Sequence, residues 1–198
     1  MEYNTETIIK ELLSYLNRAE YIKAEDIPDI SLYMDQVTTF MEEHLSSTRR
    51  YHDDKIMTKT MINNYAKNDL IPAPEKKKYD KEHIMLLIFI YYLKNILSIS
   101  DIDRLLKPLR DDYFGTAKNG VSIEKIYSAI FSESERMFPR LLKDIDTYAR
   151  KSERFSKDFP QDSSYLDYLG MVCMLGTDIY IKKQMMERLI DLMPNPDK

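Results

Sequence analysis

Side chains that could carry chemistry are few in this chain of 198 residues. The three histidines are His44, His52 and His83, and they form neither an HExxH nor an HxxxH pair. His44 and His52 could share a metal ion, but the sequence favours the interpretation that both side chains are simply solvated. The single cysteine, Cys173, lies in an apolar run, which predicts a buried and inert thiol. No glycine-rich phosphate loop occurs. We therefore expect no enzyme, no cofactor and no metal.

The most informative segment is 55–81, which carries seven lysines and three acidic residues, a net charge of +4. The whole chain has a net charge of −4, so the remainder sums to −8. Charge is therefore segregated, and a local basic surface can bind nucleic acid even though the pI is about 5.5. The alternative interpretation of the segment is a solvated loop.

Within this segment we expect a short helix that begins after the N-cap residue Thr58. Its apolar spacing turns Ile62 and Tyr65 inward, and the polar residues Lys59, Asn63, Asn64 and Lys67 face solvent. Asparagine can pair with adenine in the major groove, and lysine and threonine suit phosphates. The lysines at 76–78 lie between two short elements, where a wing could reach an adjacent groove.

The rest of the chain follows the helical period almost throughout. Asp29 is expected to cap a helix through Leu45 that turns Leu32 and Tyr33 inward. Asp80 is expected to cap a long helix through Leu97, apolar on all sides and therefore central to the core. Either Ser98 or Ser100 starts the next helix, and Ser100 and Asp103 resemble a capping box. Further helices are expected at 8–16, 122–131, 135–148 and 162–192.

The predicted fold class is all-α, because four glycines are too few for a fold rich in tight turns. Gly170 and Gly176 fall inside the last helix, where we expect them to allow close helix contact. Four segments are expected: an N-terminal helix at 1–26, a DNA-binding domain at 27–109, a linker at 110–120 and a helical region at 121–198.

Several motifs in order resemble the MerR-type winged helix-turn-helix. They are Thr58-x-x-x-Ile62-x-x-Tyr65, Leu70-Ile71-Pro72, Tyr79-Asp80-x-x-His83-Ile84 and Leu97-Ser98-Ile99-x-x-Ile102-x-x-Leu105-Leu106. More closely, the segment from Ile27 to Leu109 is similar to an uncharacterised bacterial family, domain-of-unknown-function family 1836. That similarity rests on the runs Asp29-Ile30-Ser31-Leu32-Tyr33-Met34-Asp35-Gln36-Val37 and Thr58-Lys59-Thr60-Met61-Ile62-Asn63-Asn64-Tyr65.

The resemblance implies a recognition helix at 58–66 and a basic wing. Asn63 takes the position where the MerR pattern usually has arginine, Asn64 that of the first tyrosine, and Asp69 that of the turn glycine. Asp69 can adopt the left-handed conformation that this turn needs. The expected DNA-binding residues are Lys55, Thr58, Lys59, Thr60, Asn63, Asn64, Lys67, Lys76, Lys77, Lys78 and Tyr79.

For the region 121–198, the aromatic and methionine-rich faces indicate core or a dimer interface, with a small-molecule effector pocket as the sharper alternative. Pro108 disfavours the long coiled coil through which MerR regulators dimerise. We expect a cytoplasmic regulator without membrane contact, whose partners are double-stranded DNA, a second copy in a homodimer and, as an option, an effector. The alternatives are a protein-interaction module that no longer binds DNA and an effector-gated sensor.

Overall fold

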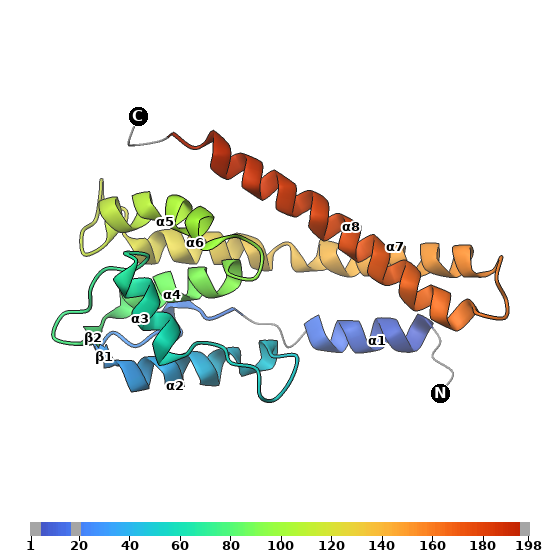
Figure 1. Ribbon diagram of the computed structural model, residues 1–198, viewed down its shortest axis with the longest axis horizontal. Helices are drawn as coiled ribbons and strands as arrows, with labels where there is room; N and C mark the ends of the chain where they lie inside the picture. The colour runs from blue at the N-terminus through green and yellow to red at the C-terminus, as the bar shows by residue number, and fades with distance from the viewer. Residues whose placement is uncertain (1–4, 17–20, 195–198) are drawn as a thin grey trace. The chain divides into compact units, whose positions relative to one another are not determined.

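The computed structural model describes residues 5–16 and 21–194 and is predominantly helical, which confirms the helical fold class (Figure 1). Its α-helices are α1 (Thr5–Leu16), α2 (Met34–Leu45), α3 (Lys59–Lys67), α4 (Lys81–Leu93), α5 (Ile99–Tyr113), α6 (Ile123–Glu135), α7 (Phe138–Ser156) and α8 (Ser163–Leu192). Short 3-10 helices are η1 (Ala24–Asp26) and η2 (Ser46–Thr48), and the strands are β1 (Leu32–Tyr33) and β2 (Lys78–Tyr79). Residues 1–4 and 17–20 of the expected N-terminal segment lie outside the described residues.

The chain divides into two compact units. The terminal unit comprises Met1–Glu20 and Glu133–Arg188, and the central unit comprises Tyr21–Ser132 and Leu189–Lys198. This grouping differs from the four expected segments, because α1 packs on α7 and because α6 belongs with the helices that precede it. The expected linker at 110–120 is also partly helical, since α5 continues past Pro108 to Tyr113.

The core of the central unit is built around α4, as its apolar sequence predicts. The eight consecutive residues 83–90 are buried, so this helix is covered on all sides. It ends at Leu93, one turn before the expected Leu97. The residues that complete this core come from α2, α3, α5 and α6, and include Val37, Met41, Ile62, Ile102, Leu106 and Tyr127.

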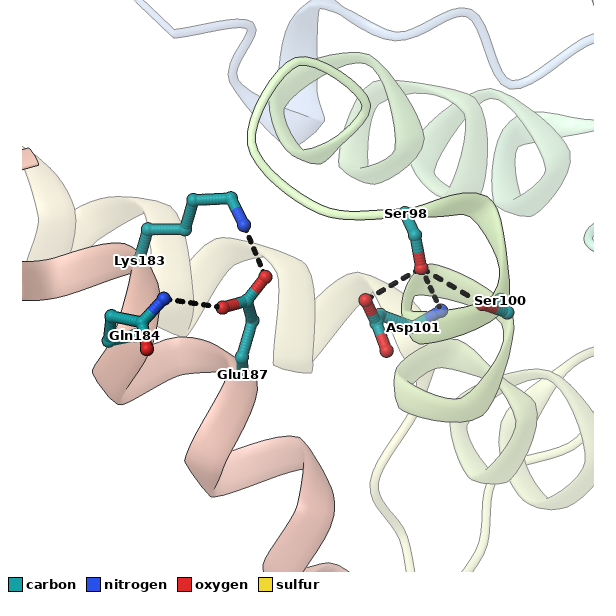
Figure 2. Close-up of polar contacts among 6 residues, drawn as sticks. All are labelled: Ser98, Ser100, Asp101, Lys183, Gln184 and Glu187. Carbon is teal, nitrogen blue, oxygen red and sulfur yellow. Dashed lines mark hydrogen bonds and ion pairs between the residues drawn. The ribbon is translucent and has the colours of Figure 1, made fainter. Parts of the chain in front are cut away.

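Side-chain caps fix the start of three helices in the central unit. Thr58 and Asp80 cap α3 and α4, as predicted. Ser98, rather than Ser100, caps α5: its hydroxyl accepts the backbone N–H of Asp101 at 3.1 Å and donates to the Asp101 carboxylate at 2.6 Å (Figure 2). The predicted capping box of Ser100 and Asp103 is therefore wrong by two residues.

The start of α2 also differs from the prediction. Leu32 and Tyr33 are extended and pair with Tyr79 and Lys78 of β2 in an antiparallel register, so the helix cannot begin at Asp29. The side-chain oxygen of Gln36 instead accepts the backbone N–H of Tyr33 at 2.9 Å. Because strand residues alternate between faces, Leu32 is buried and the Tyr33 ring is exposed, contrary to the inward position expected for it.

The terminal unit has a small core. Ile145, Ala149 and Met171 are buried together, and Ile9 and Leu12 of α1 pack against them. Gly170 lies so close to α7 that an added Cβ would collide with the Ser152 hydroxyl, which confirms its predicted role.

Other positions on α8 point away from this core. Apart from its chain neighbours and the backbone of its own helix, no described atom lies within 4 Å of the position that a Cβ on Gly176 would take, so the described residues make no close helix contact there. Cys173 is exposed, contrary to prediction, because it is about 200° around the helix from the buried Met171. Further along, Lys183 pairs with Glu187, which also accepts a hydrogen bond from Gln184 at 3.3 Å (Figure 2). In the described part of the chain, no helix has the length and apolarity needed to cross a bilayer.

Candidate nucleic-acid interface

Helix α3 presents a polar face because its apolar positions are anchored in the core. The Thr58 hydroxyl accepts the backbone N–H of Met61 at 3.2 Å and fixes the first turn. Ile62 is fully buried and Tyr65 nearly so. The opposite face is exposed and contains, as predicted, Lys59, Thr60, Asn63, Asn64 and Lys67.

The end of α3 confirms the prediction made for Asp69. Its backbone is left-handed, with φ 57°. Leu70 donates its N–H to the carbonyl of Tyr65 at 2.9 Å, and Asp69 donates to that of Ala66 at 3.3 Å. These two bonds form a Schellman motif, in which glycine is the usual left-handed residue. The guanidinium of Arg110 donates to the carbonyl of Asp69 and ties this turn to α5.

The lysine triplet forms a tight two-residue turn. Glu75 and Lys78 form a β-bridge, and Lys78 donates its N–H to the Glu75 carbonyl at 2.9 Å. Between them Lys76 and Lys77 have φ values of 49° and 65°, a combination usually supplied by asparagine and glycine. Strained backbone of this kind gathers at functional sites. The turn projects both exposed ammonium groups next to β2.

Tyr79 does not belong to this surface, contrary to prediction. It is 3% exposed and its ring packs edge-on against His83, at 5.5 Å between ring centroids. Strand alternation explains the difference: Lys78 points to solvent and lies over the exposed Tyr33 ring at 5.0 Å, and Tyr79 points to the core. Burial raises the pKa of Tyr79 and keeps its phenol neutral.

Two of the seven lysines in the segment 55–81 are neutralised by carboxylates. Lys59 pairs with the exposed Asp35 at the start of α2. Lys81 pairs with Asp29 at 2.9 Å and Glu124 at 3.0 Å. Burial alone would lower the pKa of Lys81, but its bonds to Asp29 and Glu124 outweigh this and raise it. Lysines without a carboxylate partner among the described residues are Lys55, Lys67, Lys76, Lys77 and Lys78.

The N-terminus of α4 holds β2 in place. The Asp80 carboxylate accepts the backbone N–H of His83 at 3.0 Å, and the His83 ring accepts that of Asp80 at 3.2 Å. Burial raises the pKa of the Asp80 carboxyl, but the hydrogen bonds from His83 prevail and lower it.

The structure also brings together cationic residues that the sequence reasoning missed. Arg49, Arg50, Lys55 and Lys94 line a cavity of about 330 Å³. The sequence contains the adjacent residues Arg49 and Arg50, and Lys94 directly after the apolar run of α4. Because the arginines and the lysine are far apart in the chain, their sequence positions do not indicate a shared site. A second, more open groove of about 400 Å³ lies between α7 and α8 beside Cys173. In residues 5–16 and 21–194, no three metal-ligating side chains converge.

Comparison with known proteins identifies the family of this chain. No curated protein matches the chain, and no solved structure does. The model of the family described as Domain of unknown function (DUF1836) matches residues 22–130, nearly the same stretch as the continuous part of the central unit, Tyr21–Ser132. This match confirms the predicted family and extends beyond the expected domain of 27–109 to include the first part of α6. Since it covers more than half of the chain, the protein belongs to the DUF1836 family.

Proposed function

We propose that the protein is a sequence-specific regulator that binds double-stranded DNA through a MerR-like winged helix-turn-helix in its central unit. One observation carries the proposal: the exposed face of α3 and the turn at 75–78 contribute four lysines without carboxylate partners, in a chain whose net charge is −4. A basic surface on an acidic protein directs DNA to one orientation.

In this proposal α2 and α3 are the two helices of the helix-turn-helix, and α3 enters the major groove. Asn63 and Asn64 are exposed and make no side-chain hydrogen bond to a described residue, so both amides are available to base edges. An asparagine amide can form two hydrogen bonds with adenine. Lys59, Thr60 and Lys67 flank the amides and suit phosphate oxygens.

The turn at 75–78 acts as the wing. Its two-residue loop is short and its backbone is tied to β1, so the two ammonium groups are held on a rigid support. Contacts from such a wing to phosphates add affinity without sequence preference. We assign Lys55 to the same role, and exclude Tyr79, which is buried.

A homodimer is part of the proposal, because helix-turn-helix regulators read paired half-sites with two-fold symmetry. Helix α8 offers an apolar stripe of exposed residues. Its first five members are spaced four, three, four and three residues apart, which places them on one face of the helix, and a sixth member directly follows the fifth. We define the α8 stripe as Tyr165, Leu169, Val172, Gly176, Ile179 and Tyr180. Gly176 at its centre faces open space and would permit a close helix approach.

The decisive experiment is selection from a random duplex library at physiological salt, followed by anisotropy titrations of the enriched duplex. We expect a defined motif and an affinity that falls with salt by about 0.9 log unit per log unit of salt for each phosphate contacted. Enrichment of no motif would refute sequence-specific binding.

Variants separate the two kinds of contact. Alanine at all three of Lys76, Lys77 and Lys78 should weaken binding to every duplex and reduce the salt slope. The control replaces three exposed lysines of α7 and its C-terminal end, Lys143, Lys151 and Lys157, and should leave the slope unchanged. Asn63→Ala should instead cost about 1–3 kcal/mol at one base position.

A competing function is a protein-interaction module on the same scaffold. The ion pair between Lys59 and Asp35 favours it, because a carboxylate next to the recognition helix opposes phosphate. Asp35→Asn distinguishes the two functions: it should strengthen DNA binding if α3 faces DNA. Absence of any DNA shift at low salt, with a stoichiometric protein partner, would select the module.

A further inference from the structure

A cationic cavity of about 330 Å³ lies in the central unit, apart from the exposed face of α3. Its walls are the segment 48–56, which follows α2, and the C-terminal end of α4. That volume matches a small ligand, at the lower end of the range for binding pockets. The lining is predominantly polar and includes Arg49, Arg50, Asp54, Lys55, Ile56 and Lys94.

The charges on this lining are unbalanced. Four cations face one carboxylate, Asp54, which already accepts the backbone N–H of Tyr51 at 2.9 Å. Arg49 pairs with Glu42 outside the cavity. Among the described residues, Arg50, Lys55 and Lys94 have no carboxylate within ion-pair distance. Such an excess of cations around a concavity attracts an anion.

Lys94 is the most informative of these cations. Its ammonium is half-buried and donates to the backbone carbonyl of Ile56 at 2.7 Å, leaving further N–H groups to serve another acceptor. Burial lowers its pKa, since no carboxylate compensates for the lost water. Arg49 adds a buried Nε that has no hydrogen-bond partner in the described chain. A bound oxyanion would supply an acceptor for the Arg49 Nε and a second acceptor for the Lys94 ammonium.

The cavity is connected to α3 through the backbone. Ile56 and Met57 are buried and directly precede Thr58, the cap of α3. A ligand that bridges Lys94 and the arginines would therefore hold the segment that positions α3.

We propose that this cavity binds a small metabolite bearing a phosphate or carboxylate group, which acts as an effector of the protein. The half-buried Lys94 favours a small ligand over the DNA backbone, because a duplex is too bulky to follow a phosphate into a concave site. The proposal does not require that α3 binds DNA.

The test is calorimetric titration of the full chain with pyrophosphate and, separately, with citrate, at constant ionic strength set by sodium chloride. We expect saturable binding of at least one probe to one site per chain, with a rise in melting temperature. Lys94→Met should weaken that binding about tenfold, because it removes a charged hydrogen-bond donor. The matched control Lys23→Met, an exposed lysine of the same unit, should leave the Kd within about twofold.

Two results would overturn the proposal: no saturable binding of either probe, or the same Kd in Lys94→Met. If the circular-dichroism spectrum of Lys94→Met shows that this variant does not fold, Arg50→Gln supplies the test, because the Arg50 side chain is exposed and lines the same cavity. Because titrations with pyrophosphate and citrate alone contain no DNA, failure here is distinguishable from failure of DNA binding.

Discussion

The two units bury their apolar residues to different extents. In the central unit, α4 is buried over eight consecutive residues, and single apolar side chains such as Ile30, Tyr33 and Ile99 are exposed. In the terminal unit, the core consists of Ile145, Ala149 and Met171 with two partners from α1, and α8 leaves a row of large apolar side chains exposed. Exposed apolar patches of this kind mark interaction surfaces. The difference is that the central unit surrounds one helix completely, whereas α8 of the terminal unit is covered on one side only.

Helix ends show the same contrast. Thr58, Asp80 and Ser98 cap three helices of the central unit with side-chain hydrogen bonds. By contrast, α7 begins after Met137 without a side-chain cap and relies on a proline in its first turn. Local sequence therefore specifies the helix starts of the central unit more strongly.

The largest effect should come from opening a cavity in α4. Leu87→Ala removes a fully buried side chain and should lower the free energy of unfolding by about 2–5 kcal/mol. Val172→Ala, on the exposed side of α8, should change the unfolding free energy of the isolated chain by less than about 0.5 kcal/mol. Urea denaturation at low protein concentration measures both. Similar losses for the two variants would contradict the contrast between the units.

A charge in the α8 stripe should break the proposed dimer. Val172→Asp places a carboxylate on the apolar surface and should cost about 2 kcal/mol or more of dimerisation free energy, since a buried interface charge without a partner is unfavourable. Sedimentation equilibrium measures the loss, and circular dichroism checks the fold. Thr177→Asp, exposed on α8 outside the stripe, is the control. A monomeric wild-type chain would refute this role for the stripe.

Removing one buried hydroxyl tests how completely the central unit satisfies its polar groups. Tyr127 is fully buried and donates to the carbonyl of Ile22 at 2.5 Å, and burial raises its pKa so that the phenol stays protonated. Tyr127→Phe leaves that carbonyl unpaired and should cost about 1–3 kcal/mol. Thermal and urea unfolding measure it, with the exposed Tyr180→Phe of the terminal unit as control. An equal effect of both variants would show that the hydroxyl is not buried in solution.

Sequence reasoning succeeded where the signal was local. Thr58 and Asp80 cap helices because each side chain reaches a backbone N–H three residues ahead, and Asp69 adopts the left-handed conformation that its own short side chain tolerates. The apolar face of α3 followed from the helical period alone, so the exposed residues of the candidate interface were also predictable.

Sequence reasoning failed where a residue's position depends on a contact with a residue distant in the chain. Leu32 and Tyr33 look helical until they pair with β2, and the same pairing buries Tyr79. Cys173 lies in an apolar run, but the run cannot reveal which face of α8 lacks a covering helix. The cationic cavity was unforeseeable for the same reason: Arg49 and Lys94 come from separate elements that only the fold joins.

The smallest predicted effect concerns the cap that links the core to the lysine turn. Asp80→Ala should lower the free energy of unfolding by about 1 kcal/mol, because it leaves the His83 N–H at the start of α4 without its acceptor.

The same cap should make stability depend on pH. Asp80→Asn keeps an acceptor but cannot titrate. Since folding lowers the pKa of Asp80, its charge contributes stability above the unfolded value of about 3.9, and this contribution is lost as the pH falls. Between pH 6 and pH 3, the free energy of unfolding should therefore fall less steeply with pH in Asp80→Asn than in the wild type. The control is the exposed Asp158→Asn of the terminal unit, and equal slopes in wild type and Asp80→Asn would show that this cap does not couple stability to pH.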